Sequence, residues 1–211
     1  MTVWGIVVAG GQATRFGSPK QFERLGDARV VDRAVMMAVA ACDHVTVVLP
    51  AGMPWEGDEG VTAVPGGDRR SDSVRAGLAA VDEDADVLVV HDAARPLASK
   101  SIFDAVIDAV RAGADAAVPA VPIPDTLKRV EGVRVVETVT RQGLFAVQTP
   151  QAFRADALRR AHAAEPDATD DAALVEAAGG TVVVVPGDPR NLKVTAPEDL
   201  AIAEALVQSS P

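Results

Sequence analysis

The 211-residue sequence has one cysteine, Cys42, three histidines and no tyrosine. A single cysteine excludes an intrachain disulfide, and so few histidines leave no Cys/His zinc cluster, so a cytoplasmic protein is expected. Aromatic residues make up 3% of the chain, which disfavours stacking of successive bases on an aromatic platform. The N-terminus has no basic region ahead of an apolar stretch, and apolar runs such as 87–90 are too short to span a bilayer.

Positive charge is scarce as well. The chain carries 20 Lys and Arg residues against 30 Asp and Glu residues, a formal net charge of −10. Because an acidic surface repels nucleic acids and anionic membranes, neither is an expected partner, and an anionic ligand must meet a local basic pocket. At 48% hydrophobic residues the chain can bury one substantial core, so we expect a single domain over residues 1–211.

Apolar, β-branched runs alternate with helical patterns along the chain. The runs are continuous, as in strands covered on both faces, which predicts an α/β fold with a mostly parallel sheet. Thr195 is the expected N-cap of a final helix, with Pro197 in the first turn and Glu198 three residues on. We expect strands at 3–9, 45–49, 61–64, 87–90, 116–121 and 182–185, and helices at 31–41, 71–81 and 101–110.

Residues 122–148 depart from this alternation. Two short β-branched runs flank Glu131 and Gly132, which predicts a hairpin that projects from the sheet as a β-arm. Two isolated strands are marginally stable in water. The arm therefore needs a partner surface, either its own domain or a second copy of the chain.

The most informative segment is the first apolar strand and the loop that follows it. Gly10 and Gly11 let backbone N–H groups approach phosphate oxygens closely, while Arg15 and Lys20 supply charge-assisted hydrogen bonds. The loop therefore predicts a phosphate site. The alternative is an ordinary strand-to-loop turn with two incidental surface cations.

Neither of the common phosphate loops is present. A Walker loop requires Ser or Thr after its lysine, and Gln21 stands there. A dinucleotide-binding fingerprint is broken by Gln12 and Ala13.

Asp92 and Arg95 follow the strand at 87–90, at the edge where open α/β sheets bind ligands. A single carboxylate suits Mg²⁺, which takes one or two protein carboxylates and fills its other positions with phosphates and water. The alternative is that Asp92 caps the following turn or pairs with Arg95. His91 is interpreted as a structural residue.

Two further segments reach the same edge. Residues 66–73 follow a strand and open a helix that Ser71 or Asp72 can cap, which favours a base or ribose contact. The alternative, a capped junction with a solvated pair of arginines, does not exclude ligand contact. Lys193 follows the strand at 182–185 and is a candidate third cation for phosphates, although an isolated lysine is more often a solvated surface charge.

Together these segments resemble the IspD family of 2-C-methyl-D-erythritol 4-phosphate cytidylyltransferases, within the glycosyltransferase-A-like nucleotidyltransferases. The resemblance implies a three-layer α/β/α Rossmann-like fold with a mostly parallel mixed sheet and a β-arm at about 122–148. It also implies transfer of CMP from CTP to methylerythritol phosphate, with release of pyrophosphate, in the non-mevalonate isoprenoid pathway. The blocks that carry it, in order, are 19–21, 66–73, 91–96, 124–129, 148–151 and 191–195.

The resemblance implies residue roles at the nucleotide. Asp92 matches the Mg²⁺ ligand. Residues that would neutralise charge on the phosphates and the transition state are Arg15, Lys20 and Lys193. Residues that would bind CTP are Ala9, Gly10, Gly11, Gly67, Asp68, Ser73 and Ala93.

The acceptor side is implied in the same way. Arg95 and Thr149 match residues near the sugar phosphate. Thr126 and Arg141 match residues on the family's β-arm, which reaches into the neighbouring subunit of a homodimer and helps to bind methylerythritol phosphate there. The missing partner of the arm would then be a second copy of the chain.

Two alternatives remain. Ribitol-5-phosphate cytidylyltransferases share the opening loop and the blocks at 91–96 and 149–151, and the block at 124–129 favours methylerythritol phosphate. A non-catalytic nucleotide-binding protein is the other alternative, and the presence of Arg15, Lys20, Asp92 and Lys193 together argues against it.

Overall fold

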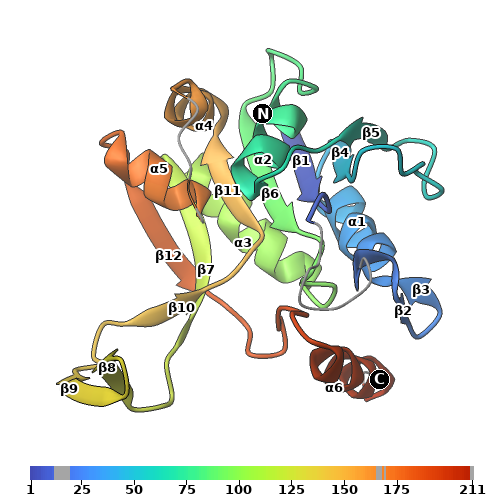
Figure 1. The fold of residues 1–211 in the computed structure, drawn as a ribbon. Coiled ribbons are helices and arrows are strands. Elements are labelled where there is room, and N and C mark those ends of the chain that lie inside the picture. Colours follow the sequence, from blue (N-terminus) through green and yellow to red (C-terminus); the bar gives the residue numbers. More distant parts are fainter. Residues whose placement is uncertain (12–19, 165–167, 169, 210–211) are drawn as a thin grey trace.

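The computed structural model describes residues 1–11, 20–164, 168 and 170–209. An eight-stranded sheet runs in the order β10-β7-β11-β6-β1-β4-β5, with β12 paired to β7 (Figure 1). Its strands are β1 (Val3–Val8), β4 (His44–Leu49), β5 (Thr62–Pro65), β6 (Val87–Asp92), β7 (Ala116–Pro122), β10 (Phe145–Val147), β11 (Gln151–Arg154) and β12 (Val182–Pro186).

The sheet is mixed and mostly parallel, as predicted. Strand β1 lies between β4 and β6, parallel to both, and Val8 is in register with Val48 and Asp92. Strand β11 runs antiparallel between β6 and β7. Because β1 and β6 end side by side, the segments that follow Val8 and Asp92 start from the same edge of the sheet.

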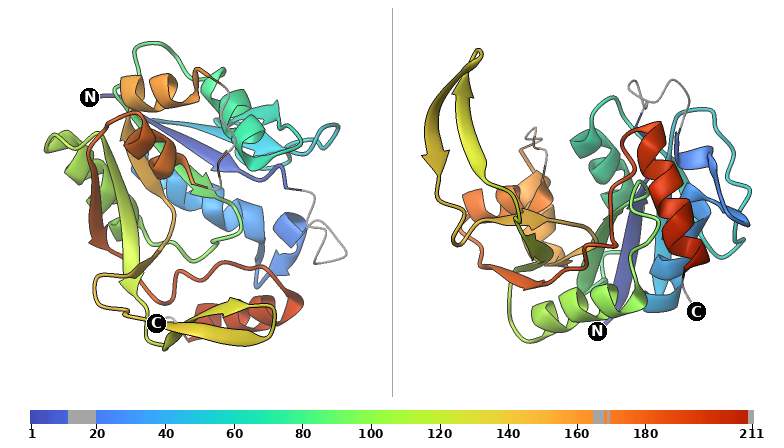
Figure 2. Two further views of the ribbon diagram at one scale, coloured as in Figure 1. Left: turned by 60° about the vertical axis from the view of Figure 1, so that its left-hand side comes forward. Right: turned by 90° about the horizontal axis from the view of Figure 1, so that it is seen from below.

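Helices cover both faces of the sheet, which confirms the three-layer α/β/α prediction (Figures 1 and 2). Helices α1 (Val30–Ala41) and α3 (Lys100–Arg111) bury one face, and α2 (Arg70–Leu78), α4 (Ala155–His162) and α5 (Asp171–Ala177) bury the other. Their separate apolar clusters explain why the strand runs are apolar without alternation. None of the helices in the described part of the chain has the length and apolar character needed to cross a membrane.

A small third cluster seats the C-terminal helix α6 (Pro197–Gln208) against β2 (Arg24–Leu25) and the start of α1, through residues such as Leu25, Val30 and Ala203. The short elements η1 (Lys20–Phe22) and β3 (Ala28–Arg29) precede and follow β2 in the chain. The predicted start of this helix is wrong by one residue. Ala196 is the N-cap, and Asp199 rather than Glu198 accepts the Ala196 N–H at 2.9 Å. The Thr195 hydroxyl donates to the same Asp199 carboxylate at 2.7 Å, because a carboxylate is the stronger acceptor.

The start of α2 also differs from the prediction. Arg69 is the N-cap residue, and neither Ser71 nor Asp72 occupies that position. Asp72 reaches back from the first turn, and its carboxylate accepts the Arg69 backbone N–H at 3.1 Å. The cap therefore comes from inside the helix, as in the reciprocal half of a capping box.

The predicted hairpin is present as β8 (Leu127–Glu131) and β9 (Arg134–Val139), joined at Gly132 with φ of 59°. In Figure 2 this yellow hairpin extends away from the sheet and its helices. Almost all of its residues are exposed, and Val133 is fully so. The hairpin therefore keeps apolar side chains in solvent that the domain's own core does not cover.

We predict that Gly77→Ala destabilises the fold although alanine favours helix. A Cβ at Gly77 would lie 2.5 Å from Ile6 Cγ2 and 3.1 Å from Val48 Cγ2, in the contact between α2 and the sheet. Overpacking of this kind costs about 1–3 kcal/mol, more than the ~1 kcal/mol gained in helix propensity. Urea denaturation should show a lower midpoint, and an unchanged or higher midpoint would contradict this packing.

Candidate active site

A pocket of about 340 Å³ opens at the carboxyl ends of β1 and β6. It lies where the first turn of α2 and the segment after β12 meet that edge of the sheet. Its walls are Val8, Ala9, Gly10, Gly11, Lys20, Gln21, Gly67, Asp68, Arg69, Arg70, Ser73, Asp92, Ala93, Ala94, Lys193 and Thr195. The fold thus brings together ten of the residues assigned to the nucleotide from sequence.

Glycine is required where the first loop meets α2. A Cβ on Gly10 would stand 2.8 Å from Ser73 Oγ, and one on Gly67 would collide with the Asp72 side chain. The Gly67 N–H donates to Ser73 Oγ at 3.3 Å. Because neither glycine carries a side chain, a ligand in the pocket can approach the backbone closely at both positions.

Gln21 joins the described residues on the two sides of the opening loop. Its buried Nε2 donates to the carbonyl oxygens of Ala9 at 2.9 Å and of Gly11 at 3.1 Å. Lys20 lines the pocket next to it. In the sequence analysis Gln21 served only to exclude a Walker loop, and its bonds to the backbone at Ala9 and Gly11 were missed. Its place directly after Lys20 was the available signal. Arg15 lies outside the described residues.

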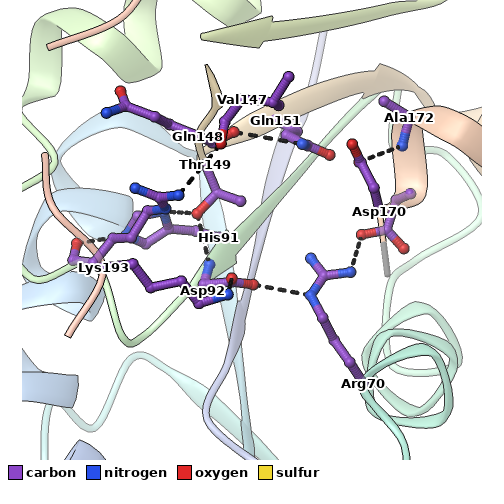
Figure 3. Close-up of polar contacts among 12 residues, drawn as sticks. Arg70, His91, Asp92, Val147, Gln148, Thr149, Gln151, Asp170, Ala172 and Lys193 are labelled. Carbon is purple, nitrogen blue, oxygen red and sulfur yellow. Dashed lines mark hydrogen bonds and ion pairs between the residues drawn. The ribbon is translucent and has the colours of Figure 1, made fainter. Parts of the chain in front are cut away.

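Asp92 stands at the end of β6 between two cations. Its Oδ1 accepts from Arg70 Nε at 3.0 Å and its Oδ2 from Lys193 Nζ at 2.6 Å (Figure 3). Burial alone would raise the pKa of the Asp92 carboxyl, yet the charges of Arg70 and Lys193 hold that pKa well below its ordinary value. Asp92 is therefore an ionised carboxylate on the pocket wall, and the predicted alternative of an ion pair with Arg95 is wrong.

Arg70 is half of the arginine pair that the sequence suggested was solvated, and that suggestion is wrong for it. Its Nη1 donates to Asp171 Oδ2 at 2.7 Å, on the opposite side from Asp92. Asp171 Oδ1 lies 3.0 Å from His162 Nε2. Arg69, by contrast, is half exposed and pairs with Asp72. No local pattern distinguishes the two arginines, because only the packing of α5 beside α2 brings Asp171 to Arg70.

Two candidate residues, Thr149 and Arg95, form a layer behind Asp92 together with His91, which the sequence had suggested is structural. The Thr149 hydroxyl accepts the Asp92 N–H at 3.0 Å and lies 3.1 Å from His91 Nδ1. Burial lowers the pKa of His91 to about 4, so its ring is neutral at neutral pH. Arg95 donates to the carbonyl oxygens of Asn191 at 2.7 Å and Val147 at 3.3 Å. The structure therefore places Thr149 and Arg95 next to the pocket but not among its lining residues.

Asn191 is the second residue that sequence reasoning left without a role. It is fully buried, and its Nδ2 donates to the Thr149 carbonyl at 3.0 Å and to Gln148 Oε1 at 3.3 Å. The Val194 N–H donates to the Ala94 carbonyl at 2.8 Å. These bonds fasten the chain on both sides of Lys193 to the end of β6. Its position as the first residue of the block at 191–195 was the available signal. The partners of its side chain could not be predicted from the sequence.

The β-arm candidates lie apart from this cluster. Thr126 and Arg141 are exposed, they do not line the pocket, and the Arg141 guanidinium donates to the Pro124 carbonyl. Within one copy of the chain, the arm therefore brings neither side chain to the pocket.

The donor set fits a magnesium ion that arrives with a nucleotide better than a resident metal. No group of three or more His, Cys, Asp or Glu side chains gathers into a metal site anywhere in the described ranges. Asp92 offers one ionised carboxylate, and Mg²⁺ binds through one or two carboxylates when phosphates and water complete its shell. Asp92 thus fits as the single protein ligand of a metal–nucleotide complex.

Comparisons with known proteins agree with this geometry. A family model described as IspD, 2-C-methyl-D-erythritol 4-phosphate cytidylyltransferase, matches residues 3–209. An enzyme of that name from Rhodococcus jostii is 44% identical over 220 residues, covering 98% of this chain and 95% of its own. One from Nocardia farcinica is 44% identical over 217 residues, covering 98% and 94%. The crystal structure of 2-C-methyl-D-erythritol 4-phosphate cytidylyltransferase from Thermus thermophilus superposes with a TM-score of 0.86 at 34% identity, over 99% of this chain and 100% of that chain.

The sheet order, the pocket and the sequence blocks around it are accounted for by one family. A match over nearly the whole chain, relatives at 44% identity and a shared three-dimensional structure leave one assignment. The chain belongs to the IspD family of 2-C-methyl-D-erythritol 4-phosphate cytidylyltransferases.

Proposed function

We propose that this chain transfers CMP from CTP to 2-C-methyl-D-erythritol 4-phosphate and releases pyrophosphate, in the cytoplasm, where CTP is available. The observation that carries the proposal is the arrangement of Lys20, Arg70 and Lys193 around a glycine-lined pocket, with the ionised carboxylate of Asp92 between Arg70 and Lys193. A net charge of −10 makes such a cationic pocket the one favourable approach for two polyanions.

The reaction is an in-line displacement at the α-phosphorus of CTP. A phosphate oxygen of the acceptor forms the new P–O bond while the bond to the pyrophosphate oxygen breaks. The acceptor phosphate is already an anionic nucleophile at neutral pH, so no covalent enzyme intermediate is required. The protein contributes positioning and the neutralisation of developing charge.

Individual residues have separate tasks in this mechanism. Lys20 and Lys193, with Arg15 on the same loop as Lys20, stabilise negative charge on the α-phosphate and on the leaving pyrophosphate. Mg²⁺ held by Asp92 and the nucleotide phosphates would supply further positive charge at the same phosphates.

The nucleoside occupies the part of the pocket formed by α2 and the first loop. Asp68 and Ser73 supply polar groups for the cytosine and the ribose. The backbone at Ala9, Gly10, Gly11, Gly67 and Ala93 allows close approach.

The acceptor is bound on the outer side of the pocket, near Arg95 and Thr149, with Thr126 and Arg141 supplied by a second copy of the chain. The exposed hairpin supports this part of the proposal. Val130 and Val135 are 51% and 54% exposed on strands that pair only with each other in the described structure, and Val133, in the turn between these strands, is 102% exposed. A two-stranded sheet with uncovered apolar side chains gains stability by packing on a partner, so a homodimer through the β-arm is expected.

A pyrophosphate-release assay with CTP and Mg²⁺ tests the function. We expect release with 2-C-methyl-D-erythritol 4-phosphate, and much slower release with ribitol 5-phosphate or when another nucleoside triphosphate replaces CTP. Faster release with ribitol 5-phosphate would reassign the acceptor. Absence of release with every phosphorylated polyol would favour a non-catalytic nucleotide-binding protein.

Lys20→Ala should nearly abolish turnover while leaving the fold intact. Loss of one preorganised charged contact to the transition state costs about 3–4 kcal/mol, or roughly a hundredfold to a thousandfold in kcat. The matched control is Lys100→Ala, which removes an exposed lysine paired with Asp104 on α3. A Lys20→Ala enzyme with nearly normal kcat would overturn the phosphate-loop assignment.

Arg141→Ala should raise the KM for the acceptor about 10–100-fold, the usual value of a hydrogen bond to a charged group, and leave the KM for CTP unchanged. If the arm crosses to the neighbouring subunit, mixing this variant with Lys20→Ala restores activity. Each mixed dimer then has one intact site, so full exchange gives about a quarter of the parent rate.

Arg134→Ala, another exposed arginine of the hairpin, is the control for the loss of surface charge. A different affinity tag on each variant, with purification over both tags in turn, verifies that mixed dimers form. Mixed dimers without restored activity, or an effect of Arg141→Ala on CTP instead of the acceptor, would contradict the arm assignment.

A further inference from the structure

Asp171 is a buried carboxylate that the mechanism above does not use. Its side chain is 2% exposed, at the first residue of α5, and it does not line the pocket. Burial alone would raise the pKa of the Asp171 carboxyl, but hydrogen bonding to His162 and the charge of Arg70 hold that pKa below its ordinary value. A buried ionised carboxylate is costly to maintain, so its contacts require an explanation.

Arg70 links this carboxylate to the pocket. The guanidinium donates from Nε to Asp92 Oδ1 at 3.0 Å and from Nη1 to Asp171 Oδ2 at 2.7 Å. Figure 3 shows Arg70 reaching from α2 toward Asp92 on one side and toward the start of α5 on the other. Because the guanidinium is a rigid planar fork, a bond on one side fixes the direction of the bond on the other.

His162 completes the brace from α4. Its Nε2 lies 3.0 Å from Asp171 Oδ1, so each oxygen of Asp171 has its own partner. The His162 side chain is 3% exposed, which keeps water from replacing that contact. These two partners fix the orientation of the Asp171 carboxylate. Asp171 in turn fixes the orientation of the Arg70 guanidinium.

The charges around Asp92 show what this orientation achieves. A free arginine binds a carboxylate through two parallel N–H bonds and occupies both of its oxygens. Here the bond from Nη1 to Asp171 fixes the orientation of the guanidinium, and in that orientation Arg70 contacts one oxygen of Asp92 through Nε while Lys193 contacts the other. The Lys193 side chain is 42% exposed on a loop, so its ammonium can shift toward a phosphate and uncover Oδ2.

We propose that Asp171 is a positioning residue that acts through Arg70 to keep Asp92 open to the divalent cation that accompanies the nucleotide. The proposal rests on the proposed function, in which Asp92 is the protein ligand of Mg²⁺. Without the Asp171 charge, Arg70 turns both arms onto Asp92 and competes with the metal.

Asp171→Asn tests this, since it removes the charge and keeps the shape. The Mg²⁺ concentration that gives half-maximal pyrophosphate release should rise about tenfold, the usual cost of losing an outer-shell partner of a metal ligand. Calorimetric titration with CTP in the absence of acceptor gives a readout independent of turnover. In EDTA the affinity of the variant for CTP should match the parent, and the gain in affinity on adding Mg²⁺ should be smaller.

The matched control is Asp170→Asn, one residue earlier. The Asp170 carboxylate caps α5 by accepting the Ala172 N–H at 3.0 Å, and asparagine is an equally good cap. This variant should keep the Mg²⁺ dependence of the parent. If Asp171→Asn does not fold, His162→Gln decides, because it loosens Asp171 while leaving the Asp171 carboxylate in place and should shift the Mg²⁺ dependence in the same direction.

Unchanged Mg²⁺ dependence in a folded Asp171→Asn enzyme overturns the proposal. The proposal is also overturned if the variant loses as much affinity for CTP, relative to the parent, in EDTA as it loses in Mg²⁺. If Asp171→Asn does not fold, unchanged Mg²⁺ dependence in His162→Gln overturns it. Failure of the proposed function looks different: the parent enzyme itself then releases no pyrophosphate with CTP, Mg²⁺ and methylerythritol phosphate.

Discussion

The arrangement of the residues around the pocket depends on the Asp92 carboxylate at the end of β6. Asp92 is 8% exposed, and a buried carboxylate stays ionised only with positive partners close by. Those partners come from far along the chain: Arg70 is 22 residues earlier and Lys193 is 101 residues later. The segment after β12 must therefore return across the edge of the sheet, and buried Asn191 fastens it there through Gln148 and Thr149.

This requirement also explains the balance of charge in the molecule. The protein is acidic as a whole, yet the cations lining the pocket face its interior and the carboxylate that neutralises two of them lies at its wall. In an empty pocket Asp92 limits repulsion between Arg70 and Lys193. When phosphates enter, Lys193 has a second anion to bind. The Asp92 carboxylate thus keeps Arg70 and Lys193 close together and still leaves Lys193 able to bind a phosphate.

The core and the β-arm are stabilised in different ways. In the core, apolar clusters fill both faces of the sheet, and polar groups behind the pocket, such as Thr149 and Asn191, bond to one another. On β8 and β9 the backbone is paired but the apolar side chains remain in solvent. The core is therefore stabilised by contacts within one copy of the chain, whereas the β-arm carries apolar side chains that this copy does not cover.

The sequence by itself determined the alternation of strands and helices over much of the chain, a hairpin within 122–148 and the loop residues of the pocket. These are local properties: continuous apolar runs, turn glycines and residues placed directly after strands. The start of α6 was misplaced by one residue, because Thr195 and Ala196 compete for the same carboxylate, that of Asp199.

Only the tertiary structure decided which arginine of the pair at 69 and 70 is buried and that Asp92 pairs with Arg70 and Lys193 instead of Arg95. It also decided that the Gln21 side chain bonds to the carbonyls of Ala9 and Gly11. Each of these depends on a partner remote in sequence or on an orientation set by packing. An ion pair between distant residues leaves no local pattern, because what selects it is the shared edge of a sheet that exists only after folding.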